Sequence, residues 1–188
     1  MNILLLNNNT KHKDALLTAL NGHNIETVFY HPGLKINDQN KDLVVLSGGG
    51  GEGNEINDAG PSGDLWYQDE MEYVLSSNKP IIGICMGFEV ICRAYGDKVV
   101  ELDETIQGFK QLKTTDIGKK QIGKSKIKQY EAHKFAVKTL KSKEFDVLAE
   151  SSAGVEVIRH KTKPIFATQF HPEISGGSIK LSQLLKSL

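Results

Sequence analysis

The chain has 188 residues and a mass of 20.7 kDa, a length that favours one domain with its own hydrophobic core. Hydrophobic residues make up 39% and charged residues 24%, a balance that argues against disorder, collagen-like repeats and coiled coils. The net charge is zero, and no stretch approaches the roughly 20 apolar residues that a membrane span needs. We therefore expect a cytoplasmic protein that binds neither membranes nor nucleic acid.

Apolar runs of strand length alternate with helical patterns in the first half of the chain. Strands are predicted at residues 2–6, 25–30, 42–47 and 81–84, and helices at residues 12–21 and 64–77. A glycine-rich stretch with seven glycines lies between residues 47 and 63. Continuous apolar strands that alternate with helices indicate a mostly parallel sheet with helices on both faces.

The pattern changes after residue 97. Short β-branched runs at residues 98–102, 126–131, 145–151, 155–160 and 165–169 predict antiparallel hairpins attached to the central sheet, and residues 179–187 predict a closing helix. Charge also shifts: residues 1–109 hold 7 basic and 16 acidic side chains, whereas residues 110–163 hold 14 and 6. Two readings fit this shift, a solvated lysine-rich surface and a basic face for an acidic partner or substrate.

Two cysteines and six histidines are the candidates for nucleophiles and metal ligands. Cys85 and Cys92 cannot form a disulfide framework, and Cys92 is expected in the core. The histidines show no metal-ligand spacing among themselves or with the cysteines, so no metal site is predicted.

The strongest motif is Gly83-Ile84-Cys85-Met86-Gly87, between a predicted strand and a predicted helix. This pattern is typical of a strand–turn–helix that carries a nucleophile at the turn, where the flanking glycines leave room for a sharp bend. The helix N-terminus would favour a thiolate at Cys85, and the N–H of Met86 would contribute to an oxyanion hole. A buried structural cysteine beneath a glycine-rich turn is the alternative.

A second motif, Phe170-His171-Pro172-Glu173, follows the last predicted strand. Pro172 disfavours a helical conformation at His171, so we expect an extended segment in which His171 and Glu173 share a face. Glu173 could then orient the imidazole while His171 faces Cys85. A surface histidine beside an unrelated glutamate is the alternative. Both motifs follow predicted parallel strands, where α/β proteins build their sites.

These segments resemble the class I (triad-type) glutamine amidotransferases. The resemblance spans residues 43–175 and includes 46–49 as the oxyanion strand, 83–87 as the nucleophile turn, 132–137 as a substrate-side loop and 169–173 as the His/Glu segment. It implies a single amidotransferase domain over residues 1–188. It also implies that Cys85 is the nucleophile, His171 the acid/base and Glu173 its orienting carboxylate, with the N–H groups of Gly49 and Met86 as oxyanion donors.

The resemblance further implies hydrolysis of L-glutamine through a γ-glutamyl thioester. Ammonia would pass to a separate ATP-dependent synthetase chain, and ATP and Mg²⁺ would be needed only there, with no cofactor in this chain. Residues 145–151, residues 160–165 and Ile174 are most similar to the stand-alone amidotransferase subunits of two-chain GMP synthases.

The same resemblance places glutamine against Gly51, Glu89, Lys134 and Phe135. Two of these depart from the family pattern, because Glu89 replaces the usual glutamine and Lys134 a small or acidic residue. An ionised carboxylate only accepts hydrogen bonds and would repel the carboxylate of glutamine. A γ-glutamyl hydrolase or peptidase, or a non-catalytic homologue that binds a partner, therefore stays open as an alternative.

Overall fold

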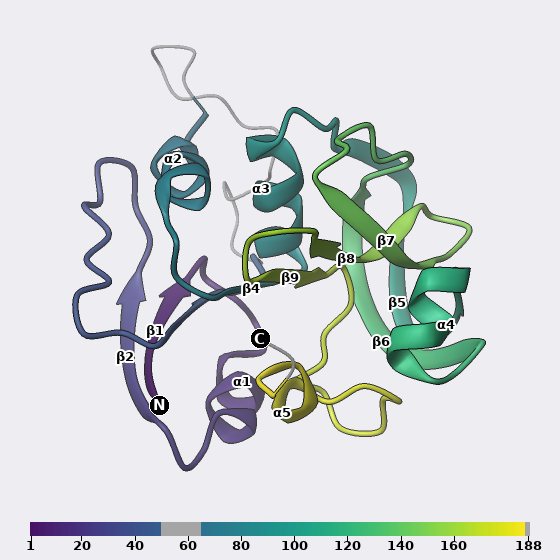
Figure 1. Ribbon diagram of the computed structural model, residues 1–188, viewed down its shortest axis with the longest axis horizontal. Coiled ribbons are helices and arrows are strands. Elements are labelled where there is room, and N and C mark those ends of the chain that lie inside the picture. The colour runs from purple at the N-terminus through teal and green to yellow at the C-terminus, as the bar shows by residue number, and fades with distance from the viewer. Residues whose placement is uncertain (50–64, 187–188) are drawn as a thin grey trace.

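The computed structural model describes residues 1–49 and 65–186, and its centre is one nine-stranded sheet (Figure 1). The spatial order of the strands is β2-β1-β3-β4-β9-β8-β7-β5-β6. The first five strands in this order are parallel, and each pair from β9 through β6 is antiparallel. The strands are β1 Asn2–Asn7, β2 Asn24–Phe29, β3 Leu43–Leu46, β4 Ile81–Ile84, β5 Val100–Thr114, β6 Lys126–Ala136, β7 Phe145–Glu150, β8 Val155–His160 and β9 Ile165–Thr168.

Helices cover both faces of the parallel half, as the sequence predicted. Helices α2 (Gln68–Ser76) and α3 (Met86–Ala94) lie on one face, and α1 (Lys13–Ala19) and α5 (Leu181–Leu184) lie on the other (Figure 1). Strand alternation explains the two layers: in β1, Leu4 and Leu6 join one core cluster, whereas Ile3 and Leu5 join the other. None of the described helices has the length and apolar content to cross a membrane.

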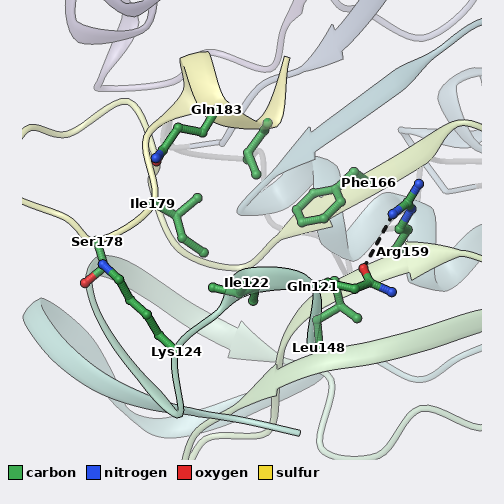
Figure 2. Close-up of a pocket in the computed structure, with 10 residues that line it drawn as sticks. Gln121, Ile122, Lys124, Leu148, Arg159, Phe166, Ser178, Ile179 and Gln183 are labelled. Atoms are coloured by element: carbon green, nitrogen blue, oxygen red, sulfur yellow. Dashed lines mark hydrogen bonds between the residues drawn. The ribbon is translucent and has the colours of Figure 1, made fainter. Parts of the chain in front are cut away.

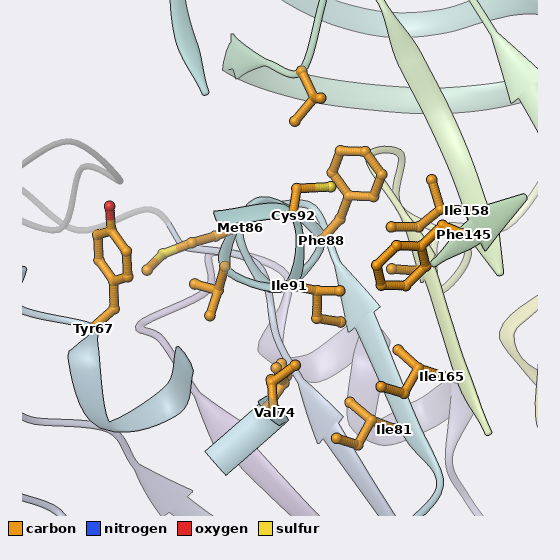
Figure 3. Close-up of a cluster of buried hydrophobic side chains, with 14 of the residues drawn as sticks. Tyr67, Val74, Ile81, Met86, Phe88, Ile91, Cys92, Phe145, Ile158 and Ile165 are labelled. Carbon is orange, nitrogen blue, oxygen red and sulfur yellow. The ribbon is translucent and has the colours of Figure 1, made fainter. Parts of the chain in front are cut away.

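The core on the α2–α3 face packs helix side chains against the sheet (Figure 3). Phe88, Ile91 and Cys92 of α3 are fully buried there, with Ile81 and Ile165 of the strands beneath them. Cys92 is thus a core residue, as predicted. Burying side chains of this size stabilises the fold by about 1.5–3 kcal/mol each.

The antiparallel half differs from the prediction of short hairpins. Strand β5 has 15 residues and pairs with β6 over most of its length, so the two form a long ribbon that continues the same sheet. The ribbon was underestimated because β5 is mostly exposed and lacks the apolar alternation of a half-buried strand.

Helix α4 (Asp116–Ile122) was not predicted from the sequence. The hydroxyl of Thr115 caps its start by accepting a hydrogen bond from the N–H of Gly118 at 3.0 Å, and Gly123 ends it in the left-handed conformation. Gly118 weakens the helical pattern, but any larger residue would collide with strand β7: a Cβ there would lie 1.8 Å from the carbonyl oxygen of Leu148. Close packing against β7 therefore requires glycine at position 118. Because glycine weakens a helical pattern, the sequence did not predict α4.

Candidate active site

The predicted triad and oxyanion residues lie where several parallel strands end. Strands β1, β3, β4 and β9 are neighbours in the sheet, and the segments that follow them contact one another. The N–H of Asn8 donates to the hydroxyl of Ser47 at 2.9 Å, and the N–H of Cys85 donates to the carbonyl of Thr168 at 2.8 Å. The carboxyl ends of parallel strands are where α/β proteins bind ligands.

Cys85 occupies a sharp turn between β4 and α3. Its backbone is in an unusual conformation for a non-glycine residue, with φ 52° and ψ −104°. Both flanking glycines are required sterically, because a Cβ on Gly83 would lie 2.7 Å from the carbonyl oxygen of Gly87 and one on Gly87 would lie 2.3 Å from that of Leu46. The predicted strand–turn–helix is therefore present, and it holds the thiol at the start of a helix.

The two predicted oxyanion donors lie next to each other. Met86 is the first residue of α3, and Gly49 packs so closely on it that a Cβ on Gly49 would lie 2.5 Å from the Met86 sulfur. The N–H of Gly87 donates to the carbonyl of Ser47 at 3.1 Å, which fastens the end of β3 to the nucleophile turn. This contact fixes the backbone around both predicted donors.

His171 and Glu173 form a buried pair. Their Nδ1 and Oε1 atoms are 2.7 Å apart, and their side chains are only 2% and 1% exposed. The segment is a turn rather than the extended chain that we expected, because the N–H of Ile174 donates to the carbonyl of His171 at 3.2 Å. Pro172, whose fixed φ suits the second position of a β-turn, explains the difference.

Cys85 and His171 approach the same point of the backbone. A Cβ added to Gly48 would lie 3.4 Å from Cβ of Cys85 and 3.1 Å from Cε1 of His171. The thiol also lies 3.9 Å from the carbonyl oxygen of Ala132, in the predicted substrate-side loop. The structure thus brings the two motifs and this loop together around one buried sulfur.

The surroundings of the thiol are apolar and negatively charged. Burial raises the pKa of the Cys85 thiol well above its ordinary value, and the charges of Glu89 and Glu173 raise it further. A hydrogen bond from the backbone N–H of Met86 opposes this effect. The resting site therefore favours the neutral thiol, in contrast to the thiolate expected from the helix N-terminus.

Of the four predicted glutamine contacts, Gly51 lies outside the described residues. Glu89 is buried in α3 and accepts a hydrogen bond from Nε2 of Gln169 at 2.8 Å. Burial raises the pKa of Glu89 to about 7, although this hydrogen bond and the charge of His133 act in the opposite direction. At neutral pH this carboxyl is therefore partly protonated and can also donate.

The other two predicted contacts lie near the end of strand β6. Nζ of Lys134 lies 2.5 Å from Oε1 of Glu101, and its side chain is half-exposed. The backbone carbonyl of Phe135 accepts a hydrogen bond from Nδ1 of His133 at 2.7 Å, while its ring packs at the edge of the core. Lys134 is thus paired with the neighbouring strand β5.

A separate pocket of about 260 Å³ lies beside α4 and α5 (Figure 2). Apolar side chains such as Ile122, Phe166 and Ile179 line it, and Arg159 donates to the Gln121 amide oxygen at 3.5 Å. None of the predicted site residues lines this pocket, so it is distinct from the candidate site.

Comparison with known proteins identifies the family of the chain. The family model described as glutamine amidotransferase class-I matches residues 4–186. The chain belongs to this family. The match includes every strand of the sheet apart from the first two residues of β1.

Curated relatives of this amidotransferase include archaeal proteins that are named as subunits of glutamine-hydrolysing GMP synthase. The protein from Methanothermobacter thermautotrophicus is 35% identical over 108 residues, which cover 55% of this chain and 56% of the relative. That alignment therefore spans only about half of the relative's length. The protein from Methanobrevibacter smithii is 28% identical over 179 residues, which cover 93% of this chain and 87% of the relative.

A solved structure from Thermoplasma acidophilum, provisionally assigned as part of a GMP synthase, superimposes with a TM-score of 0.74. It is 25% identical, and the superposition covers 94% of this amidotransferase and 86% of that chain. A glutamine amidotransferase from Thermotoga maritima, at 15% identity and a TM-score of 0.66, shares the fold.

Side chains that sequence reasoning missed surround His171 in this amidotransferase. The ring centroid of His12 lies 4.6 Å from that of His171, and the ring of Tyr130 lies 6.4 Å away. The carbonyl of Tyr130 also accepts from the N–H of His171 at 2.9 Å. No local sequence motif marks His12 as a site residue. The one signal that could have found it is its position after β1, because α/β proteins bind ligands at the carboxyl ends of their strands.

Proposed function

We propose that this chain hydrolyses L-glutamine to glutamate and ammonia with Cys85, His171 and Glu173 as a catalytic triad. The observation that carries the proposal is the meeting of the strained Cys85 turn and the His171–Glu173 pair at Gly48. Amide hydrolysis through a covalent intermediate needs a nucleophile, a base close to it and a carboxylate that orients the base.

The hydrogen bond to Glu173 determines which nitrogen of His171 acts. A carboxylate accepts hydrogen bonds, so Nδ1 carries the proton and Nε2 keeps a lone pair. Nε2 takes the proton from the Cys85 thiol as sulfur attacks the side-chain amide carbon of glutamine. The imidazolium then gives this proton to the leaving nitrogen, ammonia departs, and a γ-glutamyl thioester remains. Water, deprotonated by the same imidazole, hydrolyses the thioester to glutamate and restores the thiol.

Backbone donors stabilise the charge that develops on the amide oxygen. The N–H groups of Gly49 and Met86 are assigned this role, and losing one such donor costs about 3 kcal/mol in comparable acyl transfers. Because burial and the nearby glutamates disfavour a free thiolate at Cys85, attack and proton transfer to His171 proceed together.

The ammonia is proposed to pass to a separate ATP-dependent synthetase chain, in a GMP synthase of the two-chain type. Support comes from the archaeal relatives named as subunits of GMP synthase and from the T. acidophilum structure. Co-purification with such a synthetase chain, and GMP formation from glutamine only in the mixture, would test this assignment. A synthetase chain that forms GMP from free ammonia but not from glutamine in the presence of this chain would argue against it.

The glutaminase proposal is tested by intact mass after incubation with diazo-oxo-norleucine, an electrophile that mimics glutamine. We expect one adduct on the full chain, lost in Cys85→Ala and prevented by excess glutamine. Iodoacetamide serves as the control for thiol reactivity. Labelling by iodoacetamide without labelling by the glutamine mimic would contradict the proposal.

The second candidate function is a γ-glutamyl hydrolase or peptidase that uses the same triad. The observation that favours it is Glu89, an acidic group beside Gln169 where the family pattern has an amide. Release of amine from γ-glutamyl dipeptides faster than ammonia release from glutamine would support this candidate. A chain inert toward both substrates would instead support the non-catalytic homologue.

A further inference from the structure

A second cluster of ionisable side chains lies beneath the substrate-side loop. Glu131 and His133 alternate on the inward face of β6, and Glu156 faces them from β8. All three are buried, and one potential ligand atom from each lies within 4.8 Å of the others. They meet because the sheet curls, and the N–H of Val155 donates to the carbonyl of Val137 at 2.9 Å where the two strands approach.

The hydrogen bonds of His133 present Nε2 to this cluster. Nδ1 lies 2.7 Å from the carbonyl oxygen of Phe135, which can only accept, so Nδ1 carries a proton. Nε2 faces Oε2 of Glu131 at 3.2 Å. Metal-binding histidines commonly have their second nitrogen fixed in this way by a carbonyl. Two ligand atoms of a tetrahedral zinc ion, each about 2.1 Å from the metal, are themselves about 3.4 Å apart.

The carboxylates of the cluster have unused lone pairs. Oε1 of Glu156 accepts from the hydroxyl of Ser151 at 2.6 Å. Oε2 of Glu156 and Oε1 of Glu131 are buried and have no hydrogen-bond partner among the described residues. Buried oxygens without partners are costly, and a bound cation would satisfy them.

Charge balance points in the same direction. Two carboxylates and a neutral imidazole carry two negative charges, which a divalent cation would neutralise. Protons offer the competing solution, since burial and the charge of Glu131 raise the pKa of Glu156 to about 8. The contacts of His133 with Glu131 and Glu156 likewise raise its pKa, against the effect of burial. Metal and protons would therefore compete for this cluster.

A surface cavity borders one member of the cluster, Glu131. A cavity of about 260 Å³ is lined by Glu131 and by Ser151, the hydrogen-bond partner of Glu156. Ile106, Lys110, Gln111 and Ser152 form the rest of its wall. An ion that entered this cavity would meet Glu131 first.

We propose that Glu131, His133 and Glu156 bind one zinc ion. The imidazole nitrogen favours zinc over Mg²⁺ or Ca²⁺, which prefer all-oxygen sites. The role of the zinc ion is structural. The ion connects β6 to β8 and fixes the position of Ala132, whose carbonyl contacts the Cys85 sulfur. The proposal opposes the sequence-based expectation of no metal, which rested on histidine and cysteine spacing and did not consider two glutamates.

The test uses the full chain with Cys85→Ala, so that the thiol cannot bind zinc. After treatment with a chelator, zinc is titrated in and followed by calorimetry, elemental analysis and thermal melting. We expect one zinc ion per chain and a rise in Tm of about 5–10 °C at a hundredfold excess over Kd. Glu156→Gln and His133→Asn should each weaken zinc binding at least about tenfold.

Glu70→Gln provides the matched control. Glu70 is also fully buried with a pKa raised to about 8 by burial, but it is held by Asn8 and has no histidine beside it. This variant should bind zinc like its parent. Glu156→Gln keeps the side-chain shape and an oxygen that can accept from Ser151, so its Tm without zinc should not fall. This result distinguishes lost binding from lost folding.

Several outcomes would overturn the proposal. They are the absence of zinc binding, equal weakening by Glu156→Gln and Glu70→Gln, and binding that survives Glu156→Gln but disappears with His171→Ala. The last result would place the ion at the His12–His171 pair instead. None of these outcomes depends on glutaminase activity, so the zinc site and the proposed function can fail separately.

Discussion

Replacing Glu89 by glutamine should stabilise the protein, and more strongly at alkaline than at acidic pH. Glu89 is buried in α3, and burial raises its pKa from 4.5 to about 7. Between these two values the unfolded chain loses a proton that the folded chain keeps. The contribution of Glu89 to the free energy of unfolding therefore falls as pH rises from 4.5 to 7 and changes little above pH 7.

The size of the effect follows from the pKa difference. Each pH unit costs about 1.4 kcal/mol, so ionisable Glu89 destabilises the fold by about 1.4 kcal/mol at pH 5.5 and by about 3 kcal/mol at pH 8. An amide at this position does not titrate and still accepts from Nε2 of Gln169. Its own N–H group can donate to Oε1 of Gln169, which has no partner among the described residues.

Urea unfolding of the parent and of Glu89→Gln at pH 5.5 and pH 8 measures this difference directly. The stabilisation by the variant should be about 2 kcal/mol larger at pH 8. Other buried carboxyls, such as Glu70 and Glu156, titrate equally in both proteins and cancel in the comparison. Glu150→Gln, at an exposed position at the end of β7, is the control and should change stability little at either pH. A gain from Glu89→Gln that is the same at both pH values would refute the reasoning.

Two further substitutions probe the site. Glu173→Gln should lower kcat for glutamine by about 10³–10⁴-fold with little change in KM, because an amide no longer fixes the tautomer of His171. Steady-state kinetics measures both constants. A loss in kcat below tenfold would exclude Glu173 from the triad. Gly87→Ala should lower the free energy of unfolding by about 3 kcal/mol or more, because its Cβ would lie 2.3 Å from the carbonyl oxygen of Leu46. Gly22→Ala, with positive φ but nothing within 4 Å, should cost only about 1 kcal/mol in the same unfolding experiment.

Sequence patterns sufficed for the parallel half because its information is local. Strand β4 is a four-residue apolar run that ends at Pro80 on one side and at the Cys85 turn on the other, and the structure has the predicted bounds. Strand β1, predicted at residues 2–6, is present at Asn2–Asn7. Such segments are buried whatever their neighbours are, so composition alone marks them.

The rest depended on contacts between distant segments. The exposed part of β5 is a strand because β6 pairs with it, which no pattern within β5 reveals. The same holds for the site: two motifs located Cys85 and His171, whereas His12 and Tyr130 reach His171 only through the order of the strands. The Glu131–His133–Glu156 cluster likewise exists only once the sheet has curled.

The pairing of β4 with β9 has a consequence for how the protein is made. The nucleophile turn follows β4, but β9, which pairs with β4 and precedes His171 and Glu173, is synthesised much later. Until the ribosome has released the chain past Glu173 and β9 has entered between β4 and β8, Cys85 has no base beside it. Long-range pairing of this kind is slow to form. Under the proposed mechanism, a nascent or partly unfolded chain cannot release ammonia, so glutaminase activity would report on completion of the central sheet.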